Sequence, residues 1–304
     1  MEREYGSVAR GMITGKKEVD PEIYARNDIE RAMKEKWATW SFRGGMSTLS
    51  ERLEDLLLRC GVEIRRSSPC RKLEFNKHSV QVITDTESIK ADHVVSSVLS
   101  QNLSSMLDHQ HQELSLLLNQ ITSASCIVVN VEYKNYSPSF EGFGHLLPSF
   151  EDPCVLGVIY DSSTFKQHDS AKYISSRYTV MLGGAWFDEL VNRLGNLKDS
   201  TIEDFAVNVL REQLGIQQDP SNVIVSMQKN CIPQYYVGHS QLVNSIEKYV
   251  EDNKLALTLV GCSYKGIGIN DCINNAKLAL KQFDRGIIGN APNNDVQKQQ
   301  QQSV

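Results

Sequence analysis

The chain has 304 residues, of which 40% are hydrophobic and 23% are charged, so it can bury one large core or two medium ones. No run approaches the ~18 apolar residues of a membrane span, and the net charge of -5 carries no basic stripe, so we expect no bilayer crossing and no nucleic-acid partner. The seven cysteines form no C-x-x-C pair and no zinc spacing, which favours free thiols in a reducing compartment and no metal site.

The first part of the sequence favours helix. Apolar residues recur near a 3.6-residue period between Ile23 and Trp37, which predicts a helix within residues 1–40. A leucine stripe over residues 49–57 predicts the next helix, and Gly61 is expected to end it.

Two capping boxes are predicted from the spacing of a hydroxyl residue and a glutamate three positions later. Thr48 with Glu51 would open the leucine-striped helix. Ser200 with Glu203 would open a later amphipathic helix, which Gly215 is expected to end.

Short strands alternate with these helices. They are predicted at residues 62–64, 80–84, 93–98, 126–133, 155–160, 178–182 and 223–227. Val129, Val131 and Tyr133 should share one buried face, and a further helix is predicted near residues 114–121. The mixture predicts an α+β (mixed α/β) fold.

The last ordered stretch predicts a strand at 255–260, a glycine loop GCSYKGIGIND, and a helix over about 272–283. Gly261, Gly266 and Gly268 would let an anion approach the backbone at the helix start. The loop lacks a third glycine in the dinucleotide spacing and the Lys-Ser/Thr of a P-loop, so nucleotide contact and an ordinary glycine-rich turn both stay open.

Several motifs give the chain a family resemblance. They are Phe42-Arg43-Gly44-Gly45-Met46 followed by Leu49, Gly142-Phe143-Gly144-His145-Leu146-Leu147-Pro148, Val180-Met181-Leu182-Gly183-Gly184, Cys231-Ile232-Pro233-Gln234-Tyr235 with Gly238-His239, and GCSYKGIGINDCI. In this order and spacing the chain resembles the C-terminal two-thirds of protoporphyrinogen oxidases, over about residues 1–285. The family's opening strand with its G-x-G-x-x-G phosphate loop has no counterpart in this sequence.

The resemblance implies an FAD-linked oxidoreductase fold of the monoamine oxidase type, with a discontinuous FAD-binding domain and an α+β substrate domain, incomplete at the N-terminus. The implied parts are residues 1–40 as the end of a helical membrane-associated part, 41–100 and 251–285 as FAD-domain segments, 101–250 as the substrate domain, and 286–304 as a disordered tail. The tail is also rich in Asn, Gln and Ser, a composition that cannot bury a core.

The resemblance also implies site residues. Ile267, Gly268 and Ile269, with Gly261 and Gly266 in the same loop, would meet the isoalloxazine end of the flavin, and Cys70 would meet its adenine side, although a buried core thiol is the other interpretation of Cys70. The substrate pocket would be lined by Phe143, Leu146, Ile159, Met181 and Ile232. Each is apolar, which suits a tetrapyrrole face. The catalytic residues are unknown.

The function implied is oxidation of protoporphyrinogen IX to protoporphyrin IX with FAD and molecular oxygen, by hydride transfer to the flavin, in haem biosynthesis. The resemblance also implies peripheral association with the mitochondrial inner membrane. It leaves open whether the protein is a homodimer. The alternative is a truncated, non-catalytic form that binds porphyrin or a partner chain, because the absent phosphate loop would hold the pyrophosphate.

Histidines offer weaker candidates. His109 and His111 are expected to be solvated at a helix start, since two positions apart they do not share a helix face. His145 and His239 could each be a pocket base, although a hydrogen-bonded structural histidine is the favoured interpretation.

Overall fold

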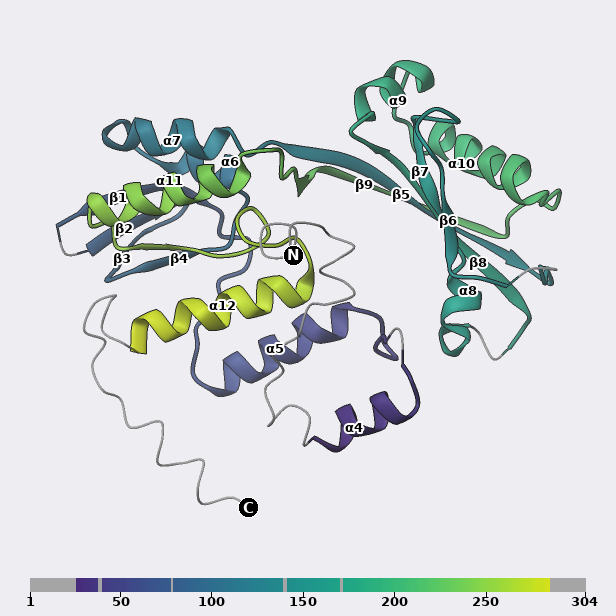
Figure 1. Ribbon diagram of the computed structural model, residues 1–304, viewed down its shortest axis with the longest axis horizontal. Helices are drawn as coiled ribbons and strands as arrows, with labels where there is room; N and C mark the ends of the chain where they lie inside the picture. The colour runs from purple at the N-terminus through teal and green to yellow at the C-terminus, as the bar shows by residue number, and fades with distance from the viewer. Residues whose placement is uncertain (1–25, 38–39, 78, 139–140, 170–171, 285–304) are drawn as a thin grey trace, which may run out of the picture. The chain divides into compact units, whose positions relative to one another are not determined.

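The structure is a computed structural model that describes residues 26–37, 40–77, 79–138, 141–169 and 172–284 (Figure 1). The chain divides into two compact units, Met1–Glu63 and Ile64–Val304, which we describe separately. The predicted tail and the first part of the predicted N-terminal helical region lie outside the described residues.

The first unit contains helices α4 (Asn27–Lys34) and α5 (Ser47–Arg59). Helix α4 confirms helix within residues 1–40, but it ends before Trp37, because Lys36 takes a left-handed φ of 55° that a helix cannot continue. Helix α5 confirms the leucine-striped helix, although Leu53 and Leu56 are half exposed in it.

Two predictions around α5 are wrong. The helix begins at Ser47 with Met46 as N-cap and has no side-chain cap, so Thr48 with Glu51 forms no capping box. Residues 62–64 form no strand, because Val62 donates its N–H to Leu57 O at 3.0 Å and closes the end of the helix instead. Gly61, with a φ of 80°, makes that turn as predicted.

The second unit begins with a small antiparallel sheet of β1 (Cys70–Asn76), β2 (Ser79–Thr84) and β3 (Ser88–Ala91), in that order. Strand β2 confirms the strand predicted at 80–84. Next, β4 (Val94–Ser96) pairs in parallel with β10 (Leu257–Leu259), so two segments distant in the chain lie side by side.

Helices of the second unit pack into a core with these strands. They are α6 (Ser100–Met106), α7 (Gln112–Asn119) and α11 (His239–Asp252), preceded by the short 3₁₀ turn η1 (His109–His111). Their buried residues join those of β1, β2 and β10 in one cluster, which includes Leu103, Leu114, Leu118, Val243 and Ile246.

The prediction that His111 is solvated is wrong. The residue is buried rather than solvated, with its ring edge-on to Phe75 and its Nδ1 3.3 Å from the Tyr249 hydroxyl. The backbone brings it inward because a 3₁₀ turn, not a regular helix start, precedes α7.

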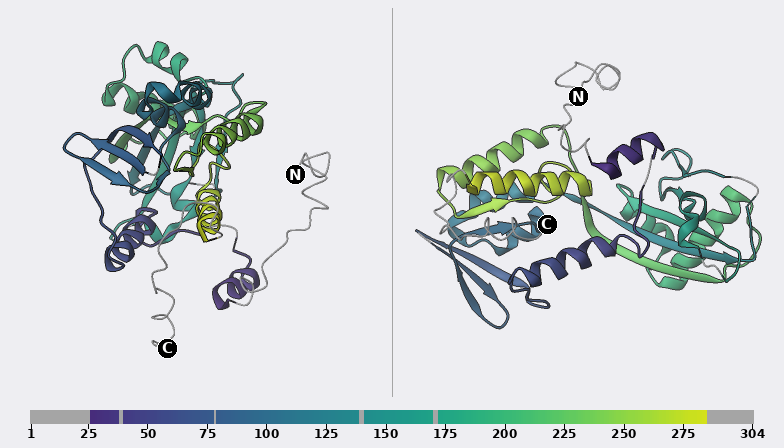
Figure 2. Two further views of the ribbon diagram at one scale, coloured as in Figure 1. Left: turned by 90° about the vertical axis from the view of Figure 1, so that its left-hand side faces the viewer. Right: turned by 90° about the horizontal axis from the view of Figure 1, so that it is seen from below.

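A five-stranded antiparallel sheet forms the middle of the chain, with strand order β6-β7-β8-β5-β9 (Figure 1). The strands are β5 (Ser123–Lys134), β6 (Gly144–Leu146), β7 (Val155–Ile159), β8 (Ser175–Gly184) and β9 (Asn222–Pro233). The four strands predicted between 126 and 227 are confirmed. The long pair β5 and β9 can be followed in Figure 2.

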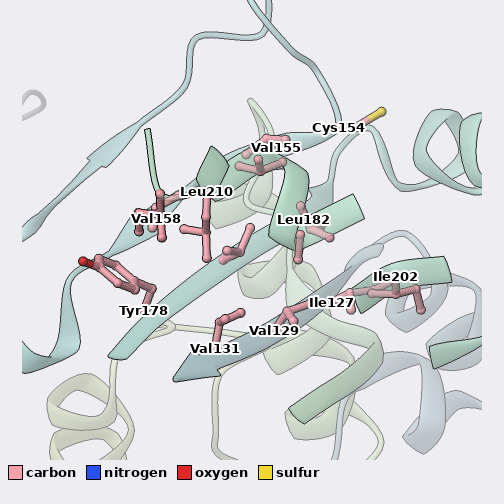
Figure 3. Packing of buried hydrophobic residues seen from close by; sticks show 14 of the residues in the cluster. Ile127, Val129, Val131, Cys154, Val155, Val158, Tyr178, Leu182, Ile202 and Leu210 are labelled. Carbon is pink, nitrogen blue, oxygen red and sulfur yellow. The ribbon is translucent and has the colours of Figure 1, made fainter. Parts of the chain in front are cut away.

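One face of this sheet carries the core. Val129, Val131 and Tyr133 alternate inward on β5 as predicted and are at most 1% exposed. Side chains from α10 (Asp199–Leu214), among them Ile202 and Leu210, point onto this face (Figure 3). The remaining helices near the sheet are α8 (Asp161–Thr164), the 3₁₀ turn η2 (Lys166–His168) and α9 (Phe187–Leu194).

Helix α10 starts differently from the prediction. It begins at Asp199, and neither Ser200 nor Glu203 caps it. Asn196 replaces the predicted capping box, because its Oδ1 accepts hydrogen bonds from Lys198 N–H and Thr201 Oγ1, both at 3.0 Å. Gly215 ends the helix in the left-handed region, as expected.

The chain ends, as far as it is described, with α12 (Ile269–Asp284), three residues longer at its start than predicted. Within the described residues no helix combines the length and apolar character needed to span a bilayer. The same residues contain no group of three or more metal-binding side chains.

Candidate functional site

The glycine loop joins β10 to α12, and its start is fixed against the end of β4. Val260 donates its N–H to Ser96 O at 2.9 Å. Gly261 follows with a φ of 93°, and a Cβ there would lie 3.0 Å from Ser97 O. Glycine is therefore required by both the backbone conformation and the close approach.

Two side chains of the loop point into the protein. Ser263 is 1% exposed, and its Oγ accepts the N–H of Ser100 at 3.0 Å. Tyr264 is 4% exposed, and burial raises the pKa of its phenol above the ordinary value. The middle of the loop is thus held by the core beneath it, whereas residues 267–270 at its far end are exposed.

Tyr235 ties the loop together from outside. Its hydroxyl donates to Cys262 O at 2.6 Å and accepts the N–H of Gly266 at 2.9 Å. Its ring stacks on His239, with centroids 3.7 Å apart, and His239 Nε2 lies 2.9 Å from Tyr264 O. His239 is therefore hydrogen-bonded as a structural histidine, and Tyr235 is a positioning residue that the sequence interpretation did not single out.

The start of α12 is shaped by Gly266, Gly268 and Asp271. Gly266 has a φ of 137°, and a Cβ there would lie 2.4 Å from Asp271 Cβ. Ile267 and Ile269 stand on either side of Gly268 and are 45% and 50% exposed. The helix start therefore presents bare backbone between two apolar side chains, with a carboxylate already placed in the first turn.

Cys70 stands at the first position of β1, paired with Thr84. It is half buried, burial raises the pKa of its thiol, and Sγ donates to Lys72 O at 3.7 Å. Its contact with the adenine side of a flavin stays a prediction.

Three of the five predicted pocket residues share a face of the five-stranded sheet. Leu146 and Met181 both pair with Gly157, and Ile159 pairs with Thr179, two residues from Met181. Directly opposed residues lie on one side, so these side chains project away from the core face that Val180 occupies.

The other two pocket candidates stand apart from that trio in the strands. Phe143 precedes β6 and is 62% exposed, and its carbonyl accepts the N–H of Tyr160. Ile232 lies near the end of β9, half buried and paired with Ala124. Convergence of all five on one cavity stays a prediction.

The sequence interpretation missed a half-buried carboxyl that is hydrogen-bonded to the same face. Asp161, at the start of α8, accepts a hydrogen bond from Thr179 Oγ1 at 2.7 Å, and Thr179 accepts one from Asn130 Nδ2 at 2.7 Å. Burial raises the pKa of Asp161. No local motif marks this residue, because its partners come from two other strands.

On the core side of the same sheet edge, His145 Nδ1 lies 2.8 Å from the Tyr160 hydroxyl, as expected for a structural histidine. Nearby, a polar hollow of about 190 Å³ is lined by residues that include Ser162, Arg177 and Tyr178. The Arg177–Asp169 ion pair at 2.7 Å lies in its wall, and none of the five predicted pocket residues lines it.

A family comparison agrees with this arrangement of loop and sheet: the chain belongs to the family of flavin containing amine oxidoreductases, whose model matches residues 4–279. Within that family it is similar to protoporphyrinogen oxidases. The protein from Bos taurus is 36% identical over 266 residues, which are 87% of this chain and 55% of the bovine one. The protein from Schizosaccharomyces pombe is 28% identical, over 93% of this chain and 58% of its own.

The chain thus spans little more than half the length of these relatives. Solved structures agree on the fold. The crystal structure of a protein from Exiguobacterium sp. 255-15 superposes with a TM-score of 0.70 at 23% identity, covering 93% of this chain and 56% of that one. Cyclohexylamine oxidase from Brevibacterium oxydans superposes with a TM-score of 0.57 at 14% identity, covering 79% of this chain and 53% of that one. The predicted α+β FAD-linked oxidoreductase fold is confirmed.

Proposed function

We propose that this chain is the flavin-ring and substrate part of an FAD-dependent protoporphyrinogen oxidase, which oxidises protoporphyrinogen IX to protoporphyrin IX. The observation that carries the proposal is the start of α12, where exposed backbone lies between Ile267 and Ile269 beside a loop held by Tyr235. The identity to protoporphyrinogen oxidases over most of the chain supports the choice of substrate.

The helix start suits a flavin ring better than a phosphate. Asp271 already complements the positive end of the helix dipole, so a further anion would meet repulsion there. Ile267 and Ile269 offer apolar contact to a planar ring, and backbone N–H groups of the first turn can donate to its polar edge. Bound FAD would supply the hydride acceptor, with molecular oxygen as the final oxidant.

In this proposal the apolar side chains Leu146, Ile159 and Met181 contact the tetrapyrrole, with Phe143 and Ile232 closing the pocket. Asp161 would anchor the substrate, because pyrrole N–H groups are donors and its carboxyl is held on that face by Thr179. Replacing it by asparagine, in a protein that also carries the N-terminal part of the bovine relative, should raise KM more than it lowers kcat, since the contact forms already in the ground state. An unchanged KM would remove Asp161 from the pocket.

We also propose a domain plan. Residues 41–100 and 251–285 would supply the FAD domain, which the parallel pairing of β4 with β10 supports. Residues 101–250 would supply the substrate domain, built on the five-stranded sheet, although helices α6, α7 and α11 share a core with β4 and β10. Cys70 falls in the first FAD segment, at the adenine side.

The test compares two proteins: the chain alone, and the chain fused behind the part of the bovine relative that precedes the matched region. A pyrophosphate needs convergent backbone donors, and the present sequence contains no G-x-G-x-x-G loop to provide them. We expect flavin absorbance and enzyme-dependent porphyrin fluorescence from the fusion and neither from the chain alone. A fusion that holds FAD but leaves protoporphyrinogen to air oxidation would contradict the substrate assignment.

The cellular setting follows from the same proposal: peripheral attachment to the mitochondrial inner membrane, as a homodimer. The family resemblance supports both. Fractionation of cells that produce the fusion should recover it with inner membranes and release it in alkaline carbonate, and light scattering should give twice the chain mass. Recovery in the cytosol would contradict the location.

A further inference from the structure

Two cysteines meet across adjacent strands of the five-stranded sheet. Cys126 on β5 and Cys231 on β9 have their sulfur atoms 3.6 Å apart, although they are 105 residues apart in the chain. Cys126 is 4% exposed, and Cys231 is half buried. The two thiols are thus in van der Waals contact, with Cys231 the more accessible.

A local irregularity of the strands produces this contact. The register of β5 with β9 shifts between Ala124 and Cys126, and Asn230 takes a left-handed φ of 47°. Asn230 N–H donates to Ser125 Oγ at 2.8 Å, and Cys231 Sγ donates to Ala124 O at 3.7 Å. The bulge therefore holds Cys231 facing the partner strand instead of continuing the regular alternation.

We propose that Cys126 and Cys231 are an oxidisable pair that forms a cross-strand disulfide when the protein meets hydrogen peroxide. The peroxide first oxidises the Cys231 thiol to a sulfenic acid and leaves as one water. The Cys126 sulfur then attacks the Cys231 sulfur, and the hydroxyl departs with the Cys126 proton as a second water. Two thiols lose two electrons, and one peroxide gains them.

The order of the two steps follows from the surroundings. Cys231 is reached first because it is the more exposed of the two. Burial raises the pKa of Cys126, so its thiolate is scarce at neutral pH and Cys126 is not the first of the two to react with peroxide. The short distance between the sulfur atoms offsets this scarcity of thiolate, because they need to move only from 3.6 Å to the ~2.0 Å of a disulfide.

The bond would act on the candidate site through β9. Cys231 precedes Ile232, a predicted pocket residue, and stands four positions before Tyr235, which holds both ends of the glycine loop. A disulfide would tie this segment to β5. The inference does not rest on the proposed function, because added peroxide serves as the oxidant.

Mass spectrometry tests the pair directly. Cells that produce the full chain are treated with hydrogen peroxide, quenched in acid, alkylated and digested with trypsin without reduction. Cleavage gives residues 91–134 with Cys126 and residues 230–248 with Cys231, one cysteine in each peptide. We expect these two peptides linked as the dominant disulfide of the chain, with loss of two of its seven alkylatable thiols. Oxidation after unfolding in concentrated urea should instead give disulfides between many different pairs of cysteines.

Two variants complete the design. Cys126→Ser should abolish the linked peptide and leave Cys231 as a longer-lived sulfenic acid, which dimedone traps. Cys60→Ser, which removes an exposed thiol in the other unit, should leave the linkage at the wild-type level. The inference is overturned if peroxide leaves peptides 91–134 and 230–248 unlinked in the folded wild-type chain, or if Cys126→Ser does not change the trapping of Cys231.

Discussion

The five-stranded sheet and the α12 segment use apolar residues in opposite ways. On the sheet, Leu182 and Leu210 are fully buried between strands and α10. On α12, Ile269, Ile273 and Leu280 are 50%, 53% and 63% exposed. The first region completes its own core, whereas the second keeps apolar surface available, as sites for large ligands do. Stability and binding are therefore expected to reside in different parts of the chain.

The largest effect should come from a cavity in the sheet. Leu182→Ala removes a fully buried side chain from β8 and should lower the free energy of unfolding by about 2–5 kcal/mol. Ile273→Ala on α12 is the matched change at an exposed position and should cost about 0.5 kcal/mol or less. Urea unfolding measures both. Equal losses would mean that α12 is as much core as the sheet.

Backbone strain in the glycine loop gives the next effect. Gly266→Ala combines a φ of 137° with a Cβ placed 2.4 Å from Asp271 Cβ, and should cost about 1–3 kcal/mol. Gly195→Ala has a φ of 69° with open space around the new Cβ, so only the milder left-handed penalty of about 1 kcal/mol applies. Thermal and urea unfolding of the pair compare the two. A harmless Gly266→Ala would show that the helix start is not held against Asp271.

A smaller and more local effect is expected from Tyr235→Phe. The change removes the hydroxyl between Cys262 O and Gly266 N–H but keeps the ring on His239. Each lost hydrogen bond is worth about 0.5–1.5 kcal/mol, so the amide of Gly266 should exchange hydrogen faster while the sheet amides do not. Tyr236→Phe, at a 65% exposed residue, is the control. Unchanged exchange at Gly266 would refute the positioning role.

The smallest effect is a dependence on pH in the sheet region. Burial lowers the pKa of His145, so the unfolded state binds its proton at a higher pH than the folded state does. Stability from this group is present above the unfolded pKa of about 6.5 and is lost as pH falls below it, by at most about 1.4 kcal/mol per pH unit. His145→Gln should flatten that slope between pH 7 and pH 5.5. A steeper slope in His145→Gln would contradict a lowered pKa of His145 in the folded state.

The correctly predicted elements are those whose sequence pattern is complete within the element itself. The alternation of Val129, Val131 and Tyr133 is complete within one strand, and Gly215 ends a helix by its own conformation. Helix α11 was not predicted, although Val243 and Ile246 lie on its buried side, because GHS at its start is no standard N-cap signal.

The errors arose where a distant or competing partner decides the structure. Asn196 accepts the hydrogen bonds expected of a capping box at Ser200, and Val62 hydrogen-bonds to the end of α5 instead of forming a strand. The hydrogen bonds of Tyr235 and Asp161 were not predicted, because their partners are brought near only by the fold. The glycine loop itself was found from its residues, but its use for a flavin needed the family resemblance.

A crystal structure of the fused chain with FAD bound tests the central claim most directly. We predict the isoalloxazine ring in van der Waals contact with the backbone of residues 267–269, between the side chains of Ile267 and Ile269. The Tyr235 hydroxyl should still bridge Cys262 and Gly266 in that structure. A flavin ring bound elsewhere, with the start of α12 facing solvent, would contradict the account.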